Sequence, residues 1–182
     1  MTGLPSFYMA DLVVRPSSLA DLPSIADIYA HHVQHGTATF ELTPPDVDEI
    51  ARRRDAILAE SLPYLVAESN GEVAGYAYAS PYRPRPAYRF TVEDSIYIHH
   101  AHLRQGIGRR LLTELIRQCE SGPWRQMIAV IGDSANASSI QLHQALGFCP
   151  AGVFRSVGWK FNRWLDTVLM QRTLGVGDRA EP

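Results

Sequence analysis

The stretch Leu103-Arg-Gln-Gly106-Ile-Gly108-Arg-Arg-Leu-Leu112 decides the fold, because it is a glycine-punctuated turn that leads from a strand into an amphipathic helix. Glycine at 106 and 108 removes the Cβ atoms that would keep a ligand away from the backbone N–H groups of the first helical turn. Those N–H groups have no partner within the helix, and the helix dipole adds partial positive charge there. With the arginines of the turn, the pattern predicts a site for an anion such as phosphate or pyrophosphate.

Length and composition are those of a soluble globular chain. The chain has 182 residues, of which 46% are hydrophobic and 20% are charged, and a formal net charge of −2. One domain over residues 12–172 accounts for this length, with flexible termini expected at 1–11 and 173–182. The charge balance predicts no partner among nucleic acids, and no apolar run approaches the roughly 18 residues that span a bilayer. We therefore expect no membrane partner either.

The N-terminus and the cysteines indicate the compartment. The first eleven residues lack the basic start and the apolar run of a secretory signal. Cys119 and Cys149 are the only cysteines, one in a predicted helix and one beside a predicted strand. This usage is typical of reduced thiols rather than of a disulfide framework. We expect a cytoplasmic protein.

The order of predicted elements is that of a mixed α/β fold. Strands are expected at 13–15, 64–68, 72–80, 91–98, 126–131, 148–153 and 167–171. Helices are expected over 18–36, from 43 onward, from the glycine turn to about 120, and over 138–146. Asn70-Gly71 predicts a tight hairpin, whereas the three prolines of 81–90 exclude a central strand there. An antiparallel first half is thus followed by one βαβ crossover.

Glu93 is the first candidate for chemistry. In the strand 91–98, alternation places Glu93 on the same face as Ser95 and Tyr97, and Asp94 on the opposite face. A carboxylate buried there has a raised pKa and can act as a general base near neutral pH. An edge-exposed glutamate, or one paired with an arginine at 83, 85 or 89, fits the same pattern. The sequence leaves both interpretations open.

A second candidate group lies in the segment that leads to Gly147-Phe148. Asn136 and His143 are seven residues apart, close to two helical turns, so they share a face of the predicted helix. Asn136 at the helix start can cap the helix or bind a ligand, and His143 can donate or accept a proton in the same cleft. A capping asparagine and a half-buried, hydrogen-bonded histidine are the alternative.

Six histidines raise the question of a metal. They are His31, His32, His35, His99, His100 and His102. Only His31 and His35 have the i, i+4 spacing of a helical ligand pair. No His-Glu-x-x-His motif or Cys/His set accompanies them. We expect no metal site.

The order of strand, anion turn with helix, strand, and then an Asn-initiated helix ending in Gly-Phe resembles the GNAT N-acetyltransferase superfamily. There the glycine turn, with the consensus Gln/Arg-x-x-Gly-x-Gly/Ala, binds the pyrophosphate of acetyl-CoA. This chain has Gly106 and Gly108 at the glycine positions but Leu103 at the leading position. The resemblance implies an α/β GNAT fold, with a twisted, mixed and mostly antiparallel sheet of six to seven strands flanked by about four helices.

Longer motifs resemble those of the phosphinothricin acetyltransferase group of this superfamily. They are Thr39-Phe40-Glu41, Tyr88 to Ile98, Val130-Ile131-Gly132, Leu142 to Phe148, Gly158 to Phe161, and Trp164-Leu165-Asp166. Together these motifs place the resemblance over nearly the whole chain. The resemblance implies acetylation of the α-amino group of phosphinothricin, methionine sulfoximine or methionine sulfone. It also implies acetyl-CoA as cosubstrate, no metal, and a homodimer.

The resemblance implies roles for individual residues. Glu93 becomes the general base for the substrate ammonium, and His143 takes the position from which a tyrosine of many GNAT enzymes protonates the CoA thiolate. The residues implied for the amino-acid pocket are Phe40, Arg83, Thr91 and Glu93, with Arg83 facing the carboxylate. The residues implied for acetyl-CoA are Ile98, His99, Arg104, Gln105, Gly106, Ile107, Gly108, Arg109, Asn136 and Ser139.

Two other functions fit the same sequence. A GNAT enzyme for another amine, such as a protein N-terminus, a polyamine or an aminoglycoside, would use the same turn. The arginines near the expected pocket disfavour the two polycations. A CoA-binding regulatory module without activity would keep the turn, but it would not need both Glu93 and His143.

Overall fold

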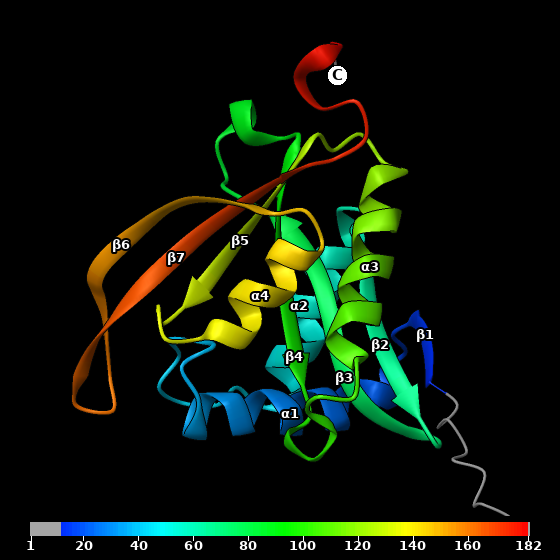
Figure 1. Ribbon diagram of the computed structural model, residues 1–182. Helices are drawn as coiled ribbons and strands as arrows, with labels where there is room; N and C mark the ends of the chain where they lie inside the picture. Colours follow the sequence, from blue (N-terminus) through cyan, green and yellow to red (C-terminus); the bar gives the residue numbers. More distant parts are fainter. Residues whose placement is uncertain (1–11, 182) are drawn as a thin grey trace, which may run out of the picture.

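The computed structural model describes residues 12–181, which form a central sheet with helices on both faces (Figure 1). The strands are β1 (Leu12–Pro16), β2 (Tyr64–Ser69), β3 (Glu72–Pro81), β4 (Thr91–Ile98), β5 (Gln126–Gly132), β6 (Cys149–Lys160) and β7 (Arg163–Thr173). The helices are α1 (Leu22–His35), α2 (Val47–Ala59), α3 (Ile107–Glu120) and α4 (Ala137–Ala145), with four short 3-10 turns between elements. The expectation for residues 1–11 lies outside the described residues.

The sheet opens in its middle. Its strand order is β1-β2-β3-β4-β5-β7-β6, and every neighbouring pair is antiparallel except β4 and β5. These two parallel strands pair only over 91–94 and 126–129, so their C-terminal halves diverge. The mixed, mostly antiparallel seven-stranded sheet confirms the predicted fold class. The divergence leaves backbone groups of both strands unpaired at the centre of the molecule.

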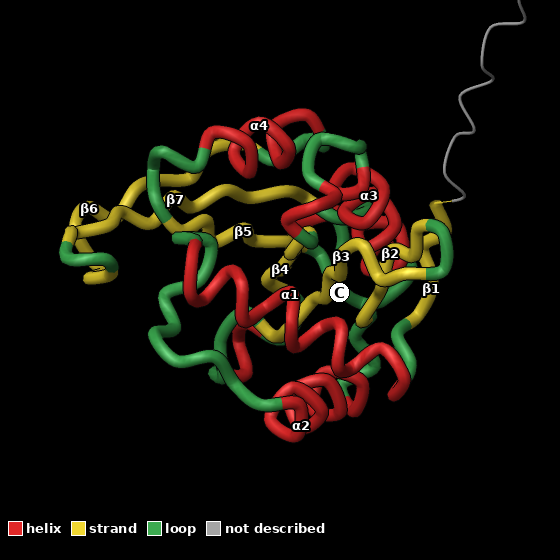
Figure 2. Tube along the Cα trace, turned by 90° about the horizontal axis from the view of Figure 1, so that it is seen from below, coloured by secondary structure: helices red, strands yellow, loops and turns green. Residues whose placement is uncertain are grey.

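Two helices cover each face of the sheet. Viewed from below, α3 and α4 lie on one side and α1 and α2 on the other (Figure 2). The predicted stripe of α3 is buried against the sheet, and it consists of Ile107, Leu111, Leu112, Leu115, Ile116 and Cys119. Burying an apolar face is what stabilises such a helix, because its intrinsic propensity alone is marginal. The packing of α3 therefore fixes the glycine turn beyond the C-terminal end of β4.

Some element boundaries differ from the sequence predictions. The second helix begins at Val47, because the carboxylate of Asp46 accepts the Glu49 N–H at 2.8 Å and caps it, so the expected start at Thr43 is wrong. The strands β6 and β7 are roughly twice as long as expected. Irregular pairing in β6 breaks the alternation that would have marked its length. The predicted hairpin at Asn70-Gly71 is confirmed, with φ of 53° and 83°.

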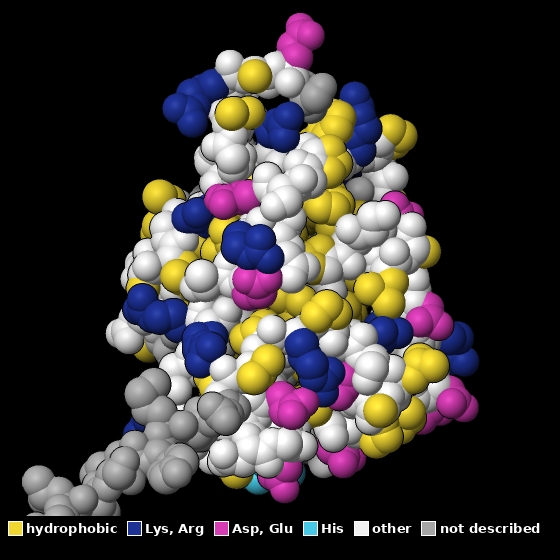
Figure 3. Space-filling model, turned by 90° about the vertical axis from the view of Figure 1, so that its right-hand side faces the viewer, with side chains coloured by type: hydrophobic (Ala, Val, Ile, Leu, Met, Phe, Trp, Pro, Cys, Tyr) yellow, Lys and Arg dark blue, Asp and Glu magenta, His cyan; other side chains and the backbone are white. Residues whose placement is uncertain are grey.

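The first residue of the segment that follows β7 packs against the body of the protein. Leu174 is completely buried, and its N–H donates to the Arg125 carbonyl at 2.9 Å. The sequence predicts a flexible terminus over residues 173–182, but these contacts of Leu174 hold the beginning of that segment in place. Figure 3 shows acidic and basic side chains interspersed over one face of the molecule. Within residues 12–181 no helix is long and apolar enough to cross a membrane.

Candidate active site

A small cavity lies where β4 and β5 diverge. Its volume is about 50 Å³, and since a water molecule needs roughly 10–15 Å³, it has room for a group of a few heavy atoms. It is lined by residues 94–97 of β4, residues 129–132 of β5, Asn136 just before α4, Ser139 and His143 of α4, and Ala38 of the α1–α2 loop. The structure thus brings the predicted helix-face pair Asn136 and His143 to one cavity. Ala38 was not predicted.

Backbone groups of β4 face this opening. The His99 N–H donates to the Ala74 carbonyl of β3 at 2.9 Å, and the Ile98 carbonyl contacts His32 Nε2 at 2.9 Å. Because backbone groups alternate sides along a strand, the N–H groups of Ile96 and Ile98 face away from β3, toward the gap. The N–H of Ile98 therefore remains available to a ligand, whereas that of His99 is already paired.

The two glycines of the anion turn serve different purposes. Gly106 is the residue before α3 and has φ of 78°, a left-handed conformation that side chains disfavour. A Cβ at Gly108 would lie 3.3 Å from Leu142 Cδ2, so this glycine allows α4 to pack close to α3. Arg104 has φ of 61° and is exposed, as are Gln105 and Arg109. The turn keeps the free N–H groups of α3 and its arginines accessible from one side.

Asn136, at the start of α4, caps the helix and also lines the cavity together with Ser139. Asn136 Oδ1 accepts the Ser139 N–H at 3.3 Å and the Ser138 hydroxyl at 3.2 Å, so its carbonyl oxygen caps the helix. Asn136 and Ser139 both line the cavity. The capping role that the sequence left open is thus present, together with a position at the cavity wall.

Glu93 lies on the α1 and α2 face of the sheet and has no ion-pair partner within residues 12–181. Burial, and to a lesser extent the charge of Asp94, raises its pKa to about 7, and the positive charge of Arg83 opposes this shift. The salt-bridged interpretation of Glu93 is therefore wrong. A carboxylate with this pKa is half ionised at neutral pH and can take up a proton there.

A larger cavity lies beside Thr91, which is two residues before Glu93 on β4. It has a volume of about 490 Å³ and contains Thr91 together with the exposed Arg83, Arg85 and Arg89 of the β3–β4 loop. Thr91 and Glu93 share a face because they are two residues apart on β4. The carboxylate of Glu93, with its raised pKa, thus lies on the same strand and face as a residue of this cationic pocket, and arginines of this kind can pair with a carboxylate ligand.

Phe40 lies at the other end of β5, apart from Arg83. A Cβ built on Gly158 would collide with the Phe40 ring, and one on Gly132 would lie 3.0 Å from Phe40 Cε1. Glycine at both positions allows the ring to lie directly on the sheet. The predicted pocket residues are therefore distributed along the opened strands, with Thr91 and Arg83 at one end and Phe40 at the other.

His143 is held by hydrogen bonds on both ring nitrogens. Nδ1 lies 2.7 Å from the Ser139 carbonyl, and Nε2 lies 2.9 Å from Asp94 Oδ2. Burial disfavours the imidazolium, but the hydrogen bond and charge of Asp94 outweigh it and raise the pKa of His143. Asp94 is a site residue that the sequence reasoning missed. Its signal was a charged residue on a strand face otherwise occupied by Val92, Ile96 and Ile98.

Three of the six histidines that suggested a metal, His31, His99 and His100, form a stack of rings. His31 and His100 have ring centroids 4.3 Å apart, and so do His99 and His100. Stacked imidazoles direct their faces, not their nitrogens, at one another. Over residues 12–181 no three His, Cys, Asp or Glu side chains are arranged to hold a metal ion.

Comparison with known proteins gives consistent matches. The family model described as "Acetyltransferase (GNAT) family" matches residues 26–148. The phosphinothricin N-acetyltransferase of Alcaligenes faecalis is 59% identical over 162 residues, which cover 89% of this chain and 82% of the relative. The L-methionine sulfoximine/L-methionine sulfone acetyltransferase of Salmonella typhimurium is 39% identical and covers 90% of this chain and 95% of the relative.

Solved structures match equally well. The crystal structure of a phosphinothricin acetyltransferase from Sinorhizobium meliloti in complex with AcCoA has a TM-score of 0.91 and 49% identity, covering 94% of this chain and 92% of that one. An acetyltransferase of Salmonella typhimurium with its cofactor acetyl-CoA has a TM-score of 0.90 and 38% identity, covering 94% of this chain and 97% of that one.

Proposed function

The chain belongs to the GNAT family of acetyltransferases, and we propose that it moves the acetyl group of acetyl-CoA to the α-amino group of small amino-acid-like substrates of the phosphinothricin, methionine sulfoximine or methionine sulfone type. The observation that carries this proposal is the placement of Glu93. Its pKa is about 7, it has no ion-pair partner within residues 12–181, and it lies between the cationic pocket and the opening of the sheet.

Acetyl-CoA fits the features of the α3 and α4 face. The free N–H groups at the start of α3, with Arg104 and Arg109, suit its diphosphate. The rest of acetyl-CoA, which carries the thioester carbonyl, suits the cavity that Asn136 and Ser139 line. The N–H of Ile98 would donate a hydrogen bond to it. Gln105, Ile107 and Gly108 complete the proposed turn, whereas the paired N–H of His99 takes no part.

Glu93 acts as the general base. An ammonium has no lone pair with which to attack a thioester, so a proton must leave first. Glu93 accepts that proton at neutral pH, directly or through a water molecule, because burial has raised its pKa to about 7. Arg83 binds the substrate carboxylate, and Thr91 lines the same pocket. Phe40, at the opposite end of β5 from Arg83, contributes an apolar wall for the side of the acceptor away from its carboxylate.

His143 supplies the proton to the departing sulfur. The Ser139 carbonyl can only accept a hydrogen bond, so Nδ1 carries a proton that is committed to that oxygen. The proton available for the thiolate is the one that His143 Nε2 shares with Asp94. Attack and departure occur with both substrates bound, and holding them together supplies much of the acceleration without a covalent enzyme intermediate.

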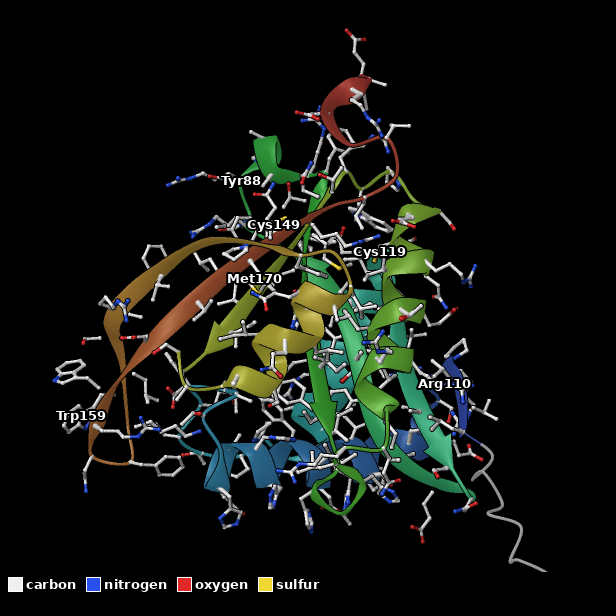
Figure 4. All side chains as sticks on the ribbon, viewed as in Figure 1. Tyr88, Arg110, Cys119, Cys149, Trp159 and Met170 are labelled. Atoms are coloured by element: carbon white, nitrogen blue, oxygen red, sulfur yellow. The ribbon has the colours of Figure 1, made fainter. Side chains whose placement is uncertain are left out.

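We also propose that the chain forms homodimers in the cytoplasm. The β6–β7 hairpin projects from the body, and Trp159 on it points outward (Figure 4). Its large apolar side chains are between 41% and 62% exposed, and they are Val153, Phe154, Val157, Trp159, Phe161 and Trp164. So many exposed large apolar side chains on one hairpin are typical of an interface. Both cysteines are free thiols, which suits a reducing compartment.

The test of the activity is thiol release from acetyl-CoA with a panel of amines. We expect turnover with phosphinothricin, methionine sulfoximine and methionine sulfone, and an acetamide product by mass spectrometry. Spermidine, an aminoglycoside and a peptide with a free N-terminus serve as controls for the other amine classes. Turnover with one of these controls alone would contradict the proposed acceptor class. Acetyl-CoA binding without turnover of any amine would contradict the enzymatic role.

A further inference from the structure

The chain contains one lysine among its 17 basic residues, and that lysine is buried. Lys160, the last residue of β6, is 3% exposed, whereas the other 16 basic residues are arginines. Fully buried lysines are rare, because removing an ammonium from water is costly unless its protons are hydrogen-bonded. The position of this lysine therefore indicates a specific contact.

Lys160 contacts the loop between α1 and α2 through two hydrogen bonds. Its Nζ donates to the Gly36 carbonyl at 2.8 Å and to the Thr39 carbonyl at 2.7 Å. Nζ also lies 5.2 Å from the centroid of the Phe161 ring. It forms no ion pair within residues 12–181, and burial lowers its pKa. The ammonium thus joins two carbonyls that lie more than 120 residues away in the chain.

The same loop segment, residues 36–41, forms walls of the site. Ala38 lines the cavity between β4 and β5. Phe40 lies on Gly158, and a Cβ on Gly132 would collide with the Thr37 carbonyl. The segment is also held by Tyr29, whose hydroxyl lies 2.9 Å from Thr39 Oγ1 in the buried interior. No regular secondary structure fixes these residues, so their position depends on side-chain contacts.

We propose that Lys160 is a positioning residue, which holds segment 36–41 against the ends of β5 and β6 so that Ala38 and Phe40 keep their places at the two substrate positions. The catalytic consequence rests on the proposed acetyl transfer, whereas the structural consequence does not. Lys160 lines neither the small cavity between β4 and β5 nor the cationic pocket, so it acts through the loop alone.

Lysine suits this position better than arginine. Its ammonium is a compact donor with three protons in tetrahedral directions, which matches two carbonyls that converge on one point. The planar guanidinium of arginine is larger and directs its donors in a fork, so it would displace the loop in a closely packed site. The use of lysine only here, in a chain that uses arginine everywhere else, is consistent with this requirement.

The single lysine makes the proposal testable in the unmodified protein. With lysine labelled at ¹³Cε and ¹⁵Nζ, the protein gives one side-chain ammonium signal, and Lys160 can be followed without assignment. We expect slow hydrogen exchange of that ammonium and slow reaction with an amine-directed acylating reagent, read by mass spectrometry at residue 160. Reaction at the rate of free lysine would overturn the proposal.

Variants test the effect on the loop and on catalysis. Lys160→Met keeps the stem and removes the donors, and Arg155→Met removes a cation from a 75% exposed side chain of the same strand as the control. In Lys160→Met we expect amide exchange in a peptide covering 36–46 to accelerate at least about tenfold, and kcat/KM for the acceptor to fall about 10- to 100-fold, the range that an ångström-scale misplacement produces. The acetyl-CoA Kd should stay within about twofold, because the anion turn is untouched. Lys160→Arg keeps a cationic donor but should displace the loop, so its kcat/KM for the acceptor should stay below that of the wild type.

The outcomes separate this proposal from the proposed function. Unchanged exchange of the 36–46 peptide in Lys160→Met would overturn the positioning role, whatever the activity. If the wild-type chain acetylates none of the amines, the proposed function fails, yet labelling and exchange still decide whether Lys160 holds the loop. An equal loss of acetyl-CoA binding and acceptor turnover in Lys160→Met would show a general structural role and contradict the specific one.

Discussion

His143 Nε2 lies 2.9 Å from Asp94 Oδ2, with the two side chains only 2% and 1% exposed, so α4 and β4 are joined by a buried hydrogen-bonded pair at the wall of the small cavity between β4 and β5. The pair combines two functions. It fixes the imidazole that the proposed mechanism uses, and it raises the pKa of His143. A buried pair of this kind tolerates the loss of one partner poorly, because the remaining group is left without compensation.

Replacing Asp94 by Asn should destabilise the protein by about 3–5 kcal/mol and change its pH dependence. A raised folded-state pKa of His143 means that its stabilisation is complete below the unfolded pKa of about 6.5 and is lost as the pH rises through the folded pKa. The difference in unfolding free energy between wild type and Asp94→Asn should therefore shrink at alkaline pH. Denaturant titrations between pH 6 and 9 measure it.

Asp94→Asn also tests whether His143 is the general acid that protonates the thiolate. Without Asp94 the pKa of His143 falls, so the alkaline decline of kcat should begin at lower pH. Asp166→Asn, which removes a carboxylate from a surface ion pair with Arg155, serves as the control. An alkaline limb that keeps its position in Asp94→Asn would rule out His143 as the proton donor to the thiolate.

Replacing Glu93 by Gln should lower kcat by about 100-fold or more, in the range that general base catalysis contributes. In the wild type, kcat/KM should rise with pH and level off above a pKa of about 7, because only the carboxylate accepts a proton. This pH dependence should be absent from the residual rate of the variant. Glu72→Gln, in the exposed β2–β3 hairpin, is the control. Full turnover of Glu93→Gln at pH 7 would show that another group is the base.

Glu93→Gln should also be more stable than the wild type at neutral and alkaline pH. A carboxyl whose folded-state pKa is raised favours folding when protonated, and that contribution is lost as the pH rises from its unfolded value toward about 7. Thermal unfolding at pH 5 and pH 8 tests this. A higher Tm for the variant at pH 8 but not at pH 5 is the expected result, and equal shifts at both pH values would contradict the buried carboxylate.

Replacing Gly106 by Ala should weaken acetyl-CoA binding, and Gly71→Ala is its matched control. Both glycines have positive φ, 78° and 83°, and a Cβ added at either would meet no atom within 4 Å. Each substitution therefore costs about 1–2 kcal/mol of backbone strain. Only the change at Gly106 lies at the anion turn, so only that variant should raise the acetyl-CoA Kd in calorimetry. Equal Kd values for both variants would argue against the turn as the diphosphate site.

Replacing Gly158 by Ala should raise the acceptor KM at least about tenfold, because displacing a group by an ångström costs up to about a hundredfold. The new methyl group would collide with the Phe40 ring, whereas Gly152→Ala on the same strand meets nothing within 4 Å. Steady-state kinetics of the two variants with methionine sulfone separate these effects. Parallel behaviour of both variants would remove Phe40 from the acceptor side.

Replacing Trp164 by Glu should convert the proposed dimer to a monomer. Trp164 is 62% exposed and its ring lies 5.1 Å from that of Trp159 on the projecting hairpin. A charge there opposes burial of this surface against a second copy. Sedimentation velocity should give the mass of two chains for the wild type and of one for the variant. A monomeric wild type would contradict the homodimer.

Much of the fold could be predicted from local pattern. The stripe of α3, the Asn70-Gly71 hairpin and the alternation of β4 each follow from spacing alone, and each is present in the structure. The length of β6 and β7 could not be predicted, because irregular pairing removes the alternation that marks a strand. The start of α2 was misplaced because two prolines, compatible with a first helical turn, precede the residue that caps it.

By itself the sequence determined the position of a turn suited to an anion, because free N–H groups at a helix start require only a local glycine turn. It also determined that Glu93 and Asp94 face opposite sides of β4. Only the tertiary structure decided which distant residues Asp94 and Lys160 contact. Asp94 meets His143 across 49 residues and Lys160 meets the loop at Thr39 across 121, since such contacts arise from the packing of distant elements and leave no periodicity in the chain. The pKa of Glu93 is likewise a property of its burial, which no local pattern specifies.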